Sequence, residues 1–593
     1  MARERKKSLK IYIKTVVFSF NISFKASPVI MMFRLITLFV EAFIPTINML
    51  SIKNIVDYLI STNSKKVFFW FGILAITQIG TTIIGKLNDY FSNIHSDKIS
   101  LAITKDIINK INQLDISYFD NPKMYDEIIN VTRDIGSIPS LIWNILSTIQ
   151  LFIKFVTAAI VLFEFSWWAP LCICITCVPN FVFDKKYALK LYYWTRDSVN
   201  EVRKMNYSYE ILTSKAFCKD IRINSLFNFL KEKYEKQWLN WYSEKKKILD
   251  KQFIASFITV FFTNIVMLFF LLIVIKRISA GEGLIGDVTY YIGMVGQLTT
   301  ATFGIISTFS DIVQQNVKIG YYDNFKKWKS TLKSESDNLI IDTFESLEFI
   351  NVSFKYPNTD HYVLKNISFK INKGEKVGIV GKNGCGKSTI VKLILYFYKP
   401  TEGCIKINGK DTSNIEITEY YKLLSIMLQD YINYSFTLKE NIITTDINSY
   451  CDDASIIDAC KKSNAYEFVE KWENGIESYL TKNFDINGKE LSGGQWQKLA
   501  IARFFYKKAQ VYIMDEPSAS LDIESENIIF TNVFEQSLNS TLILISHSLS
   551  NLRLMDKIIV LDEGYISEIG SHDELVNKGG IYSHLYKIQK QKM

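Results

Sequence analysis

Uncharged apolar segments in the first half of the chain constrain its fold more than any other feature. Residues 67–85, 252–275 and 288–310 contain no Asp, Glu, Lys or Arg. A helix of about 20 predominantly apolar residues is long enough to cross the hydrocarbon core of a bilayer. The sequence therefore predicts a membrane domain built from helices.

Three further segments bring the predicted number of spans to six: residues 28–50, 140–163 and 165–183. Arg34 and Glu41 interrupt the first of these, and Lys154 interrupts the second. Because a charge at the centre of a span costs about 2.5–3.5 kcal/mol on insertion scales, such residues usually face the interior of a helix bundle. We expect Glu41 and Lys154 to face that interior. Arg34 lies nearer a span end, and we expect its side chain to extend toward the membrane surface.

The segments that connect the spans alternate between short and long. The long ones, 86–139 and 184–251, are rich in Lys and Arg, so the positive-inside rule places them and both termini in the cytoplasm. The net charge of +9 is concentrated in residues 1–10 and 185–251, which favours cytoplasmic loops over a nucleic-acid surface. We therefore expect a lipid bilayer, and no nucleic acid, as a partner.

Three shorter segments of the first half mix aromatic and polar residues. Residues 8–24 place Lys and aromatic residues at roughly helical spacing and predict an interfacial helix. Residues 118–128 and 215–227 lie at the tips of the two long segments, where we expect short helices that contact another part of the protein. The alternative for both tips is an ordinary solvated loop.

The character of the sequence changes after the sixth span. Strand-like segments such as 347–357 and 376–380 alternate with helical ones, which indicates an α/β domain with helices on the faces of a sheet. We expect residues 1–320 to form an α-helical membrane domain, residues 321–345 a linker, and residues 346–593 the α/β domain.

Residues 381–389, GKNGCGKST, lie between a predicted buried strand and a predicted helix. They match the G-x-x-x-x-G-K-[ST] pattern, in which backbone N–H groups wrap phosphate oxygens. In this pattern Lys387 offers its charge to the outer phosphates and Ser388 offers a hydroxyl to Mg²⁺. The predicted phosphate-binding residues are Gly381, Lys382, Asn383, Gly384, Cys385, Gly386, Lys387, Ser388 and Thr389.

Cys385 differs from the other seven cysteines because it lies within this phosphate loop. The eight cysteines show no paired spacing typical of zinc, and we expect those of the second half to be reduced thiols. The predicted helix N-terminus and Lys387 both favour the thiolate of Cys385. We therefore expect this thiol to be readily alkylated.

Residues 511–516, VYIMDE, are predicted to complete the nucleotide site that the phosphate loop begins. The apolar residues predict a buried strand, and two carboxylates follow at its end. Asp515 is placed to hold the Mg²⁺ shell. Glu516 faces differently and can polarise an attacking water.

Residues 491–505, LSGGQWQKLAIARFF, begin with two glycines and continue as an amphipathic helix, so the chain has a second helix start that can face an anion. The second half of the chain resembles the nucleotide-binding domain of the ABC transporters, in which LSGGQ is the signature sequence. Six spans fused ahead of such a domain resemble an ABC exporter half-transporter. The resemblance implies an α-helical membrane domain of ABC exporter type followed by an α/β P-loop NTPase domain of ABC type.

The resemblance also implies roles for residues outside the phosphate loop. Tyr356 matches the aromatic residue that stacks on adenine. Gln429 matches the glutamine that meets Mg²⁺ and the attacking water, and His547 matches the histidine that contacts the γ-phosphate. The implied catalytic residues are thus Glu516, His547 and Gln429, and the implied metal ligands are Ser388, Gln429 and Asp515. The signature loop is Ser492, Gly493, Gly494 and Gln495, and the loop that crosses between two domains is Ser520, Leu521 and Asp522.

In this family the signature helix closes on ATP that a partner chain holds. The resemblance therefore implies two chains stacked head to tail around two ATP molecules. Because the motif residues are all intact, we expect a homodimer with two hydrolytic sites. The chain departs from many exporters at Asp485 and Ile486, where a Gly-Glu pair would contact the membrane domain.

The cargo is less constrained than the ATPase. The signature segment and YFDNPKMYDEI at 118–128 resemble the lantibiotic exporter branch, so we expect a peptide exporter of a bacterial plasma membrane. Since the chain starts directly with its interfacial helix, we expect any leader peptide to be removed by another protein. The alternatives are a multidrug, lipid or lipid-linked oligosaccharide exporter. An ATP-gated channel or a regulatory binding module is a different class, and ligand-stimulated ATP hydrolysis would argue against it.

Overall fold

The computed structural model describes residues 16–133, 136–330, 332, 339–357, 359–447, 452–517, 521–546 and 548–591. The chain divides into two compact units. The helical unit comprises Met1–Asn112 and Asp126–Trp328, and the ATPase unit comprises Gln113–Tyr125 and Lys329–Met593. One short segment from the first half of the sequence thus folds with the second half.

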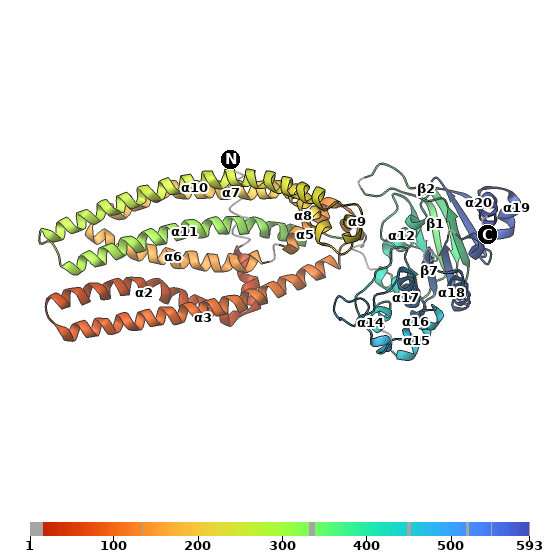
Figure 1. Cartoon of the computed structure of the whole chain (residues 1–593), viewed down its shortest axis with the longest axis horizontal. Coiled ribbons are helices and arrows are strands. Elements are labelled where there is room, and N and C mark those ends of the chain that lie inside the picture. The colour runs from red at the N-terminus through yellow and green to blue at the C-terminus, as the bar shows by residue number, and fades with distance from the viewer. Residues whose placement is uncertain are drawn as a thin grey trace. The chain divides into compact units, whose positions relative to one another are not determined.

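Six long helices correspond to the six predicted spans, although the fourth, predicted at 165–183, begins only at Trp168. They are α2 Pro28–Ile60, α3 Ser64–Ile111, α6 Ser137–Phe165, α7 Trp168–Asp197, α10 Phe227–Ser279 and α11 Ile285–Lys326. In Figure 1, α2 and α3 run side by side as one pair and α7 and α10 as another, with α6 packed on α11. Because α11 continues through Lys326, the helical unit extends past residue 320.

Within the described residues, five helices are long and apolar enough to cross a membrane, and α7 is not among them. The lower apolarity of α7 comes in part from Asn180 and Asp184, whose side chains find partners on α10. The Thr259 hydroxyl donates to Asn180 at 2.9 Å, and the Ser256 hydroxyl donates to Asp184 at 3.1 Å. Pairing of polar side chains between neighbouring helices makes such residues tolerable inside a bundle.

The charged residues of α2 are paired inside the bundle. The Arg34 side chain donates to Glu41 at 2.9 Å and to Gln150 at 3.2 Å, and Arg34 is only 6% exposed. Glu41 also accepts a hydrogen bond from Asn88 at 2.8 Å. The expectation that Arg34 extends to the membrane surface is therefore wrong, because these partners compensate a charge inside the bundle. Glu41 faces the interior as expected, and Lys154 is half-buried.

Short helices link the long ones. They are α4 Ile116–Asp120, α5 Pro122–Arg133, α8 Val199–Thr213 and α9 Cys218–Ile223. The tip expected at 118–128 thus contains α4 and the start of α5, and the tip expected at 215–227 contains α9. Of the expected interfacial helix, residues 8–15 lie outside the described part, and Val16–Ala26 is helical.

The ATPase unit contains two sheets. The antiparallel sheet has the order β2-β1-β4-β5, with β1 Ser346–Phe354, β2 Leu364–Asn372, β4 Glu402–Ile407 and β5 Lys410–Asp411. The larger sheet has the order β10-β9-β3-β8-β7-β6, with β3 Lys376–Gly381, β6 Leu424–Met427, β7 Val511–Asp515, β8 Thr541–Ile545, β9 Lys557–Asp562 and β10 Tyr565–Gly570.

The larger sheet positions the functional residues. Strands β3, β6, β7, β8 and β9 pair in parallel, and only β10 is antiparallel. Strands β7 and β8 are buried throughout, as expected for parallel strands covered on both faces. Helices α12 Lys387–Ile394, α17 Gly493–Tyr506 and α18 Ile523–Gln536 connect or flank these strands. The predicted α/β class is confirmed.

The ATPase unit also contains shorter elements. They are η1 Thr412–Asn414, α13 Ile417–Lys422, α14 Leu438–Ile443, α15 Asp453–Lys462, α16 Tyr466–Val469, η2 Gly475–Glu477, η3 Leu549–Leu552, α19 His572–Lys578 and α20 Ile581–Lys590.

Candidate functional site

The phosphate loop joins the end of β3 to the start of α12. Gly384 and Gly386 have φ values of +80° and +107°, which favour glycine. A Cβ atom on Gly386 would also lie 2.5 Å from the Leu364 side chain, and one on Gly381 would lie 2.4 Å from the Leu561 carbonyl oxygen. The glycines are therefore required by both backbone conformation and close packing, and they leave the loop N–H groups uncovered by side chains.

The Lys387 ammonium group spans this loop. Its Nζ donates to the carbonyl oxygens of Gly381 at 2.9 Å and of Lys382 at 3.1 Å, and the residue is 5% exposed. A buried ammonium held only by carbonyl oxygens has no anionic partner in these two bonds, so it is poised to bind an anion.

A cavity of about 360 Å³ lies over the loop. It brings the predicted Gln429 and Glu516 next to residues of the phosphate loop. The lining residues are Val363, Asn383, Gly384, Gly386, Lys387, Ser388, Thr389, Gln429 and Glu516. Val363 was not predicted, and it directly precedes β2 without belonging to any recognisable motif.

The two carboxylates at the end of β7 have different surroundings. Asp515 is 3% exposed, and burial raises its pKa to about 6, while a hydrogen bond with Ser388 acts in the opposite direction. Its Oδ1 atom has no hydrogen-bond partner among the described residues. Glu516 adopts a φ of +52° and its carboxylate accepts a hydrogen bond from the Gln429 amide at 2.8 Å. The backbone turn thus directs two adjacent acids to different positions.

Tyr356 lies beside the phosphate loop. Its hydroxyl group is 3.1 Å from that of Thr389, and the Lys392 ammonium lies 5.3 Å from the centre of its ring. The ring lines a second cleft of about 510 Å³, separate from the cavity that holds Gln429. Tyr356 is therefore positioned to bind a group adjacent to the phosphates.

The signature residues begin α17. Ser492 and Gln495 form a capping box: the Ser492 N–H donates to the Gln495 side chain at 2.9 Å, and the Gln495 N–H donates to the Ser492 hydroxyl at 3.3 Å. Gly493 is exposed and Gly494 is half-buried, and a Cβ on Gly493 would meet nothing within 4 Å. None of the four lines the phosphate cavity of its own chain, so this helix start is open to an external anion.

Asp522 caps α18 in a similar way. The Ser525 backbone N–H and hydroxyl group both donate to its carboxylate at 2.8 Å, and the backbone bond lowers its pKa.

Among the other expected residues, His547 and Ser520 lie outside the described residues. Ile486, which stands where many exporters have a Gly-Glu pair, is 85% exposed.

Cys385 corrects one expectation. Its side chain is 6% exposed, and burial raises the pKa of the thiol even though Lys387 and backbone N–H groups favour the thiolate. The sequence neighbours of Cys385 suggested the opposite direction, because they do not reveal that the side chain points into the core beside Gly381. Cys385 is therefore a poor nucleophile in this conformation.

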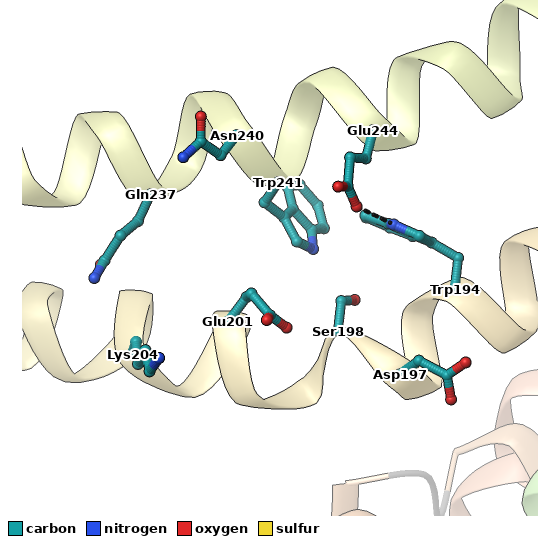
Figure 2. A pocket seen from close by; sticks show the side chains of 9 residues that line it. All are labelled: Trp194, Asp197, Ser198, Glu201, Lys204, Gln237, Asn240, Trp241 and Glu244. Carbon is teal, nitrogen blue, oxygen red and sulfur yellow. Dashed lines mark hydrogen bonds between the residues drawn. The ribbon is translucent and has the colours of Figure 1, made fainter.

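A third cavity, of about 400 Å³, lies in the helical unit between α7 and α8 on one side and α10 on the other (Figure 2). The Trp194 indole donates to Glu244 at 3.1 Å, and its ring lies 5.3 Å from that of Trp241. Glu201 projects toward Trp241 from α8, and Ser198, the residue that separates α7 and α8, also projects toward it. The sequence analysis did not single out these residues, and none of the predicted nucleotide ligands lines the cavity.

Comparisons with known proteins agree with both parts of the chain. Residues 364–519 match the ABC transporter family, and residues 31–213 match the ABC transporter transmembrane region. The chain is 30% identical to the nisin transport ATP-binding protein of Lactococcus lactis subsp. lactis over 554 residues, covering 92% of this chain and 91% of that protein. It is also 30% identical to the subtilin transport ATP-binding protein of Bacillus subtilis over 529 residues, covering 86% and 84%.

A solved structure of a bacterial Atm1-family ABC exporter with ATP bound has the same fold. Its TM-score is 0.77 at 21% identity, and the match covers 95% of this chain and 99% of that one. The resemblance inferred from the LSGGQ segment is therefore confirmed. Because relatives at 30% identity share both parts of the chain, this protein belongs to the ABC exporters, as a half-transporter in which an ATP-hydrolysing domain drives transport through a multi-pass membrane domain and which functions through dimerisation.

Proposed function

We propose that this ABC exporter carries a peptide out of a bacterial cell as a homodimer, with the ATPase domain and both termini in the cytoplasm. The cargo assignment is supported by the nisin and subtilin transport proteins, which are similar to this chain along most of its length. Lys/Arg-rich segments between the spans support the orientation. A multidrug, lipid or lipid-linked oligosaccharide exporter is the alternative.

The observation that carries the ATPase mechanism is the cavity in which Lys387, Gln429 and Glu516 converge. The triphosphate would replace the Gly381 and Lys382 carbonyl oxygens as partners of the Lys387 ammonium. The uncovered N–H groups of the loop would bind the remaining phosphate oxygens. Binding thus rests on the loop and on Lys387.

Residues suited to Mg²⁺ line the same cavity or, like Asp515, contact a residue that lines it. The buried Asp515 carboxyl has an oxygen without a partner within the described part of the chain, and Ser388 and Gln429 add hydroxyl and amide oxygens. Mg²⁺ prefers such oxygen ligands together with phosphate oxygens. When bound, the ion would supply positive charge that stabilises the transferring phosphoryl group.

Glu516 and Gln429 would handle the attacking water. The Gln429 amide donates to the Glu516 carboxylate at 2.8 Å and so holds it in the cavity, where the carboxylate would orient the water and accept its proton. We further propose that His547 contacts the γ-phosphate, and that Ser492, Gly493 and Gly494 bind the nucleotide held by the partner chain. Capping by Gln495 would keep the start of α17 ordered, and capping by Asp522 would do the same for α18.

Transport by purified protein tests the cargo proposal. The chain would be reconstituted in vesicles with outward-facing ATPase domains, and uptake of a lanthionine-containing precursor peptide would be measured with ATP. We expect uptake and stimulated ATP hydrolysis, both absent in Glu516→Gln. ATP-dependent movement of a lipid-linked oligosaccharide or an apolar dye, with no response to the peptide, would favour the alternative.

A further inference from the structure

The cavity between α7, α8 and α10 lies where the chain interrupts a long helix. Helix α7 ends at Asp197 and α8 begins at Val199, so Ser198 alone separates them, and there is no proline or glycine at this break. Ser198 faces α10 and lines the cavity, as Figure 2 shows. The volume of about 400 Å³ is within the usual range for small-molecule sites. Its walls belong to residues 184–251, which we expect to lie in the cytoplasm.

Two tryptophans form the centre of this cavity. Their rings lie 5.3 Å apart, and the Trp194 indole donates to Glu244 at 3.1 Å. The indole nitrogen of Trp241 is buried and has no hydrogen-bond partner among the described residues, although Trp241 lines the cavity. Because a buried donor without a partner is unfavourable, this N–H group is available to an acceptor that enters the cavity.

Two carboxylates reach the cavity from opposite walls, Glu201 from α8 and Glu244 from α10 (Figure 2). Within the part of the chain that the structure describes, neither forms an ion pair, although the surrounding segments are rich in Lys and Arg. Lys204 lines the cavity without pairing with either carboxylate. The Lys245 ammonium lies against the Trp241 ring instead, 4.9 Å from its centre. The cavity thus presents two carboxylates that lack a cationic partner.

An occupant that satisfies these groups carries a cation and a hydrogen-bond acceptor close together. A guanidinium or ammonium group would bind the carboxylates and lie against the indole rings, since tryptophan attracts cations more strongly than other aromatic residues do. A neighbouring carbonyl oxygen would accept from the Trp241 N–H group. A lysine or arginine residue of a peptide supplies both groups, whereas an inorganic cation supplies no acceptor.

We propose that this cavity binds a basic residue of a peptide, with its side-chain cation between Glu201 and Glu244 and its backbone carbonyl on Trp241. In assigning that peptide to the cargo, the proposal rests on the proposed export of a peptide. It adds a recognition site in the helical unit, separate from the nucleotide cavity. Arginine should bind more tightly than lysine, because a planar guanidinium group can bridge two carboxylates and stack on an indole.

Calorimetry with short peptides tests the charge requirement. Full-length protein in lipid nanodiscs, without nucleotide, would be titrated with the N-acetylated, C-amidated peptide Gly-Ala-Arg-Ala-Gly, with empty nanodiscs as the blank. The same peptide with citrulline in place of arginine keeps the shape and loses the charge, so we expect it to bind roughly tenfold more weakly or worse.

Neutral variants of the two carboxylates identify where the arginine binds. Glu201→Gln and Glu244→Gln should each weaken the arginine peptide by roughly fivefold or more and leave the citrulline peptide unchanged, because the lost interaction needs both charges. The controls are Glu210→Gln on α8 and Glu232→Gln on α10, two exposed glutamates that do not line the cavity and should change neither affinity.

Charge reversal gives a result that a merely structural role would not produce. The double variant Glu201→Lys/Glu244→Lys should lose the arginine peptide and bind Gly-Ala-Glu-Ala-Gly, which the unmodified protein should not bind. Trp241→Phe removes the indole N–H group and should weaken the arginine and citrulline peptides alike, by roughly threefold or more. Trp238→Phe, at an exposed position three residues earlier on α10, is its control. Basal ATP hydrolysis should persist in every variant and shows that each one folds.

The outcomes separate this proposal from the proposed function. Equal affinity for the arginine and citrulline peptides would overturn the cavity assignment, while uptake of a peptide by the vesicles would leave peptide export intact. Equal losses in Glu210→Gln and Glu201→Gln would also overturn it, because general surface charge would then account for the binding. Arginine-dependent binding in a protein that transports an apolar dye and no peptide would instead contradict the proposed cargo.

Discussion

At the scale of single residues, the proposed nucleotide site contains two neighbouring carboxylates with different orientations. Asp515 ends a buried strand and lies in the interior, where burial raises its pKa to about 6. Glu516 follows in a left-handed conformation, with a φ of +52°, and reaches the cavity that Gln429 lines. A non-glycine residue with positive φ is uncommon, and such strained positions concentrate at functional sites.

Glu516→Gln tests this orientation. The amide keeps the size of the side chain but cannot accept a proton from water, so we expect ATP hydrolysis to fall roughly 100-fold or more. ATP binding should persist, because it rests on Lys387 and the loop N–H groups, and a closed dimer should accumulate. Glu563→Gln changes an exposed acid that also has a positive φ; it is the control and should hydrolyse ATP normally. Near-normal hydrolysis in Glu516→Gln would show that another residue activates the water.

Cys385 offers a second residue-scale prediction. A raised pKa means that less thiolate is present at pH 7 than for an ordinary cysteine, so alkylation by N-ethylmaleimide should be slow at pH 7 and accelerate as the pH rises toward the raised pKa, by roughly tenfold per unit. Peptide mass spectrometry would compare its rate with that of the half-buried Cys218 in the same sample. Rapid inactivation at pH 7 that Cys385→Ala abolishes would contradict the buried position.

At the scale of elements, helix starts organise the ATPase unit. Ser492 begins α17 and Ser571 begins α19, each with a reciprocal capping box in which the serine hydroxyl accepts from the N–H three residues later. The two caps are chemically alike, but only the first belongs to the signature sequence. A cap that merely stabilises a helix can therefore be compared with one that also presents N–H groups to a phosphate.

Ser492→Ala and Ser571→Ala exploit this similarity. Each should lower the stability of the protein by about 0.5–2 kcal/mol, measured as a similar decrease in its thermal midpoint. Only Ser492→Ala should impair ATP hydrolysis, by roughly tenfold or more, since the first turn of α17 would no longer present its N–H groups in fixed positions. Similar hydrolysis in both variants would limit Ser492 to a capping role.

At the scale of the whole molecule, we expect one chain not to complete its own nucleotide site. The phosphate cavity contains Lys387, Gln429 and Glu516 but none of the signature residues. The signature helix start is instead open, with nothing within 4 Å of a Cβ placed on Gly493. If two copies pair head to tail, the signature helix of each would face the phosphate cavity of the other, as we propose.

Complementation between two inactive variants tests this pairing. Lys387→Ala removes the phosphate-binding ammonium, and Gly493→Asp adds a carboxylate that fits sterically but repels the partner's nucleotide. Each homodimer should be inactive. A heterodimer purified through two different tags contains one intact composite site and should regain roughly half of the normal activity if sites act independently. An inactive heterodimer would mean that the signature serves its own chain.

The sequence determined on its own the features that depend on residues close together in the chain. Six apolar segments became six helices, and the GKNGCGKST spacing placed Lys387 in a loop between β3 and α12. Span length and loop conformation are local properties, governed by bilayer thickness and by the backbone freedom of glycine. Helices α3 and α10 extend well beyond the apolar spans at 67–85 and 252–275, as the length and helical pattern of segments 86–139 and 184–251 predict.

Only the tertiary structure decided the environment of individual side chains. Arg34 is buried because its guanidinium group donates to Glu41, seven residues further along α2, and to Gln150 of α6. Cys385 is a buried thiol because its side chain packs into the core, whatever its sequence neighbours favour. Tyr398 meets Asp120 although the two residues are separated by 278 positions in the chain. Burial and pairing depend on contacts between distant segments, and a local pattern contains no information about which distant segment will supply the partner.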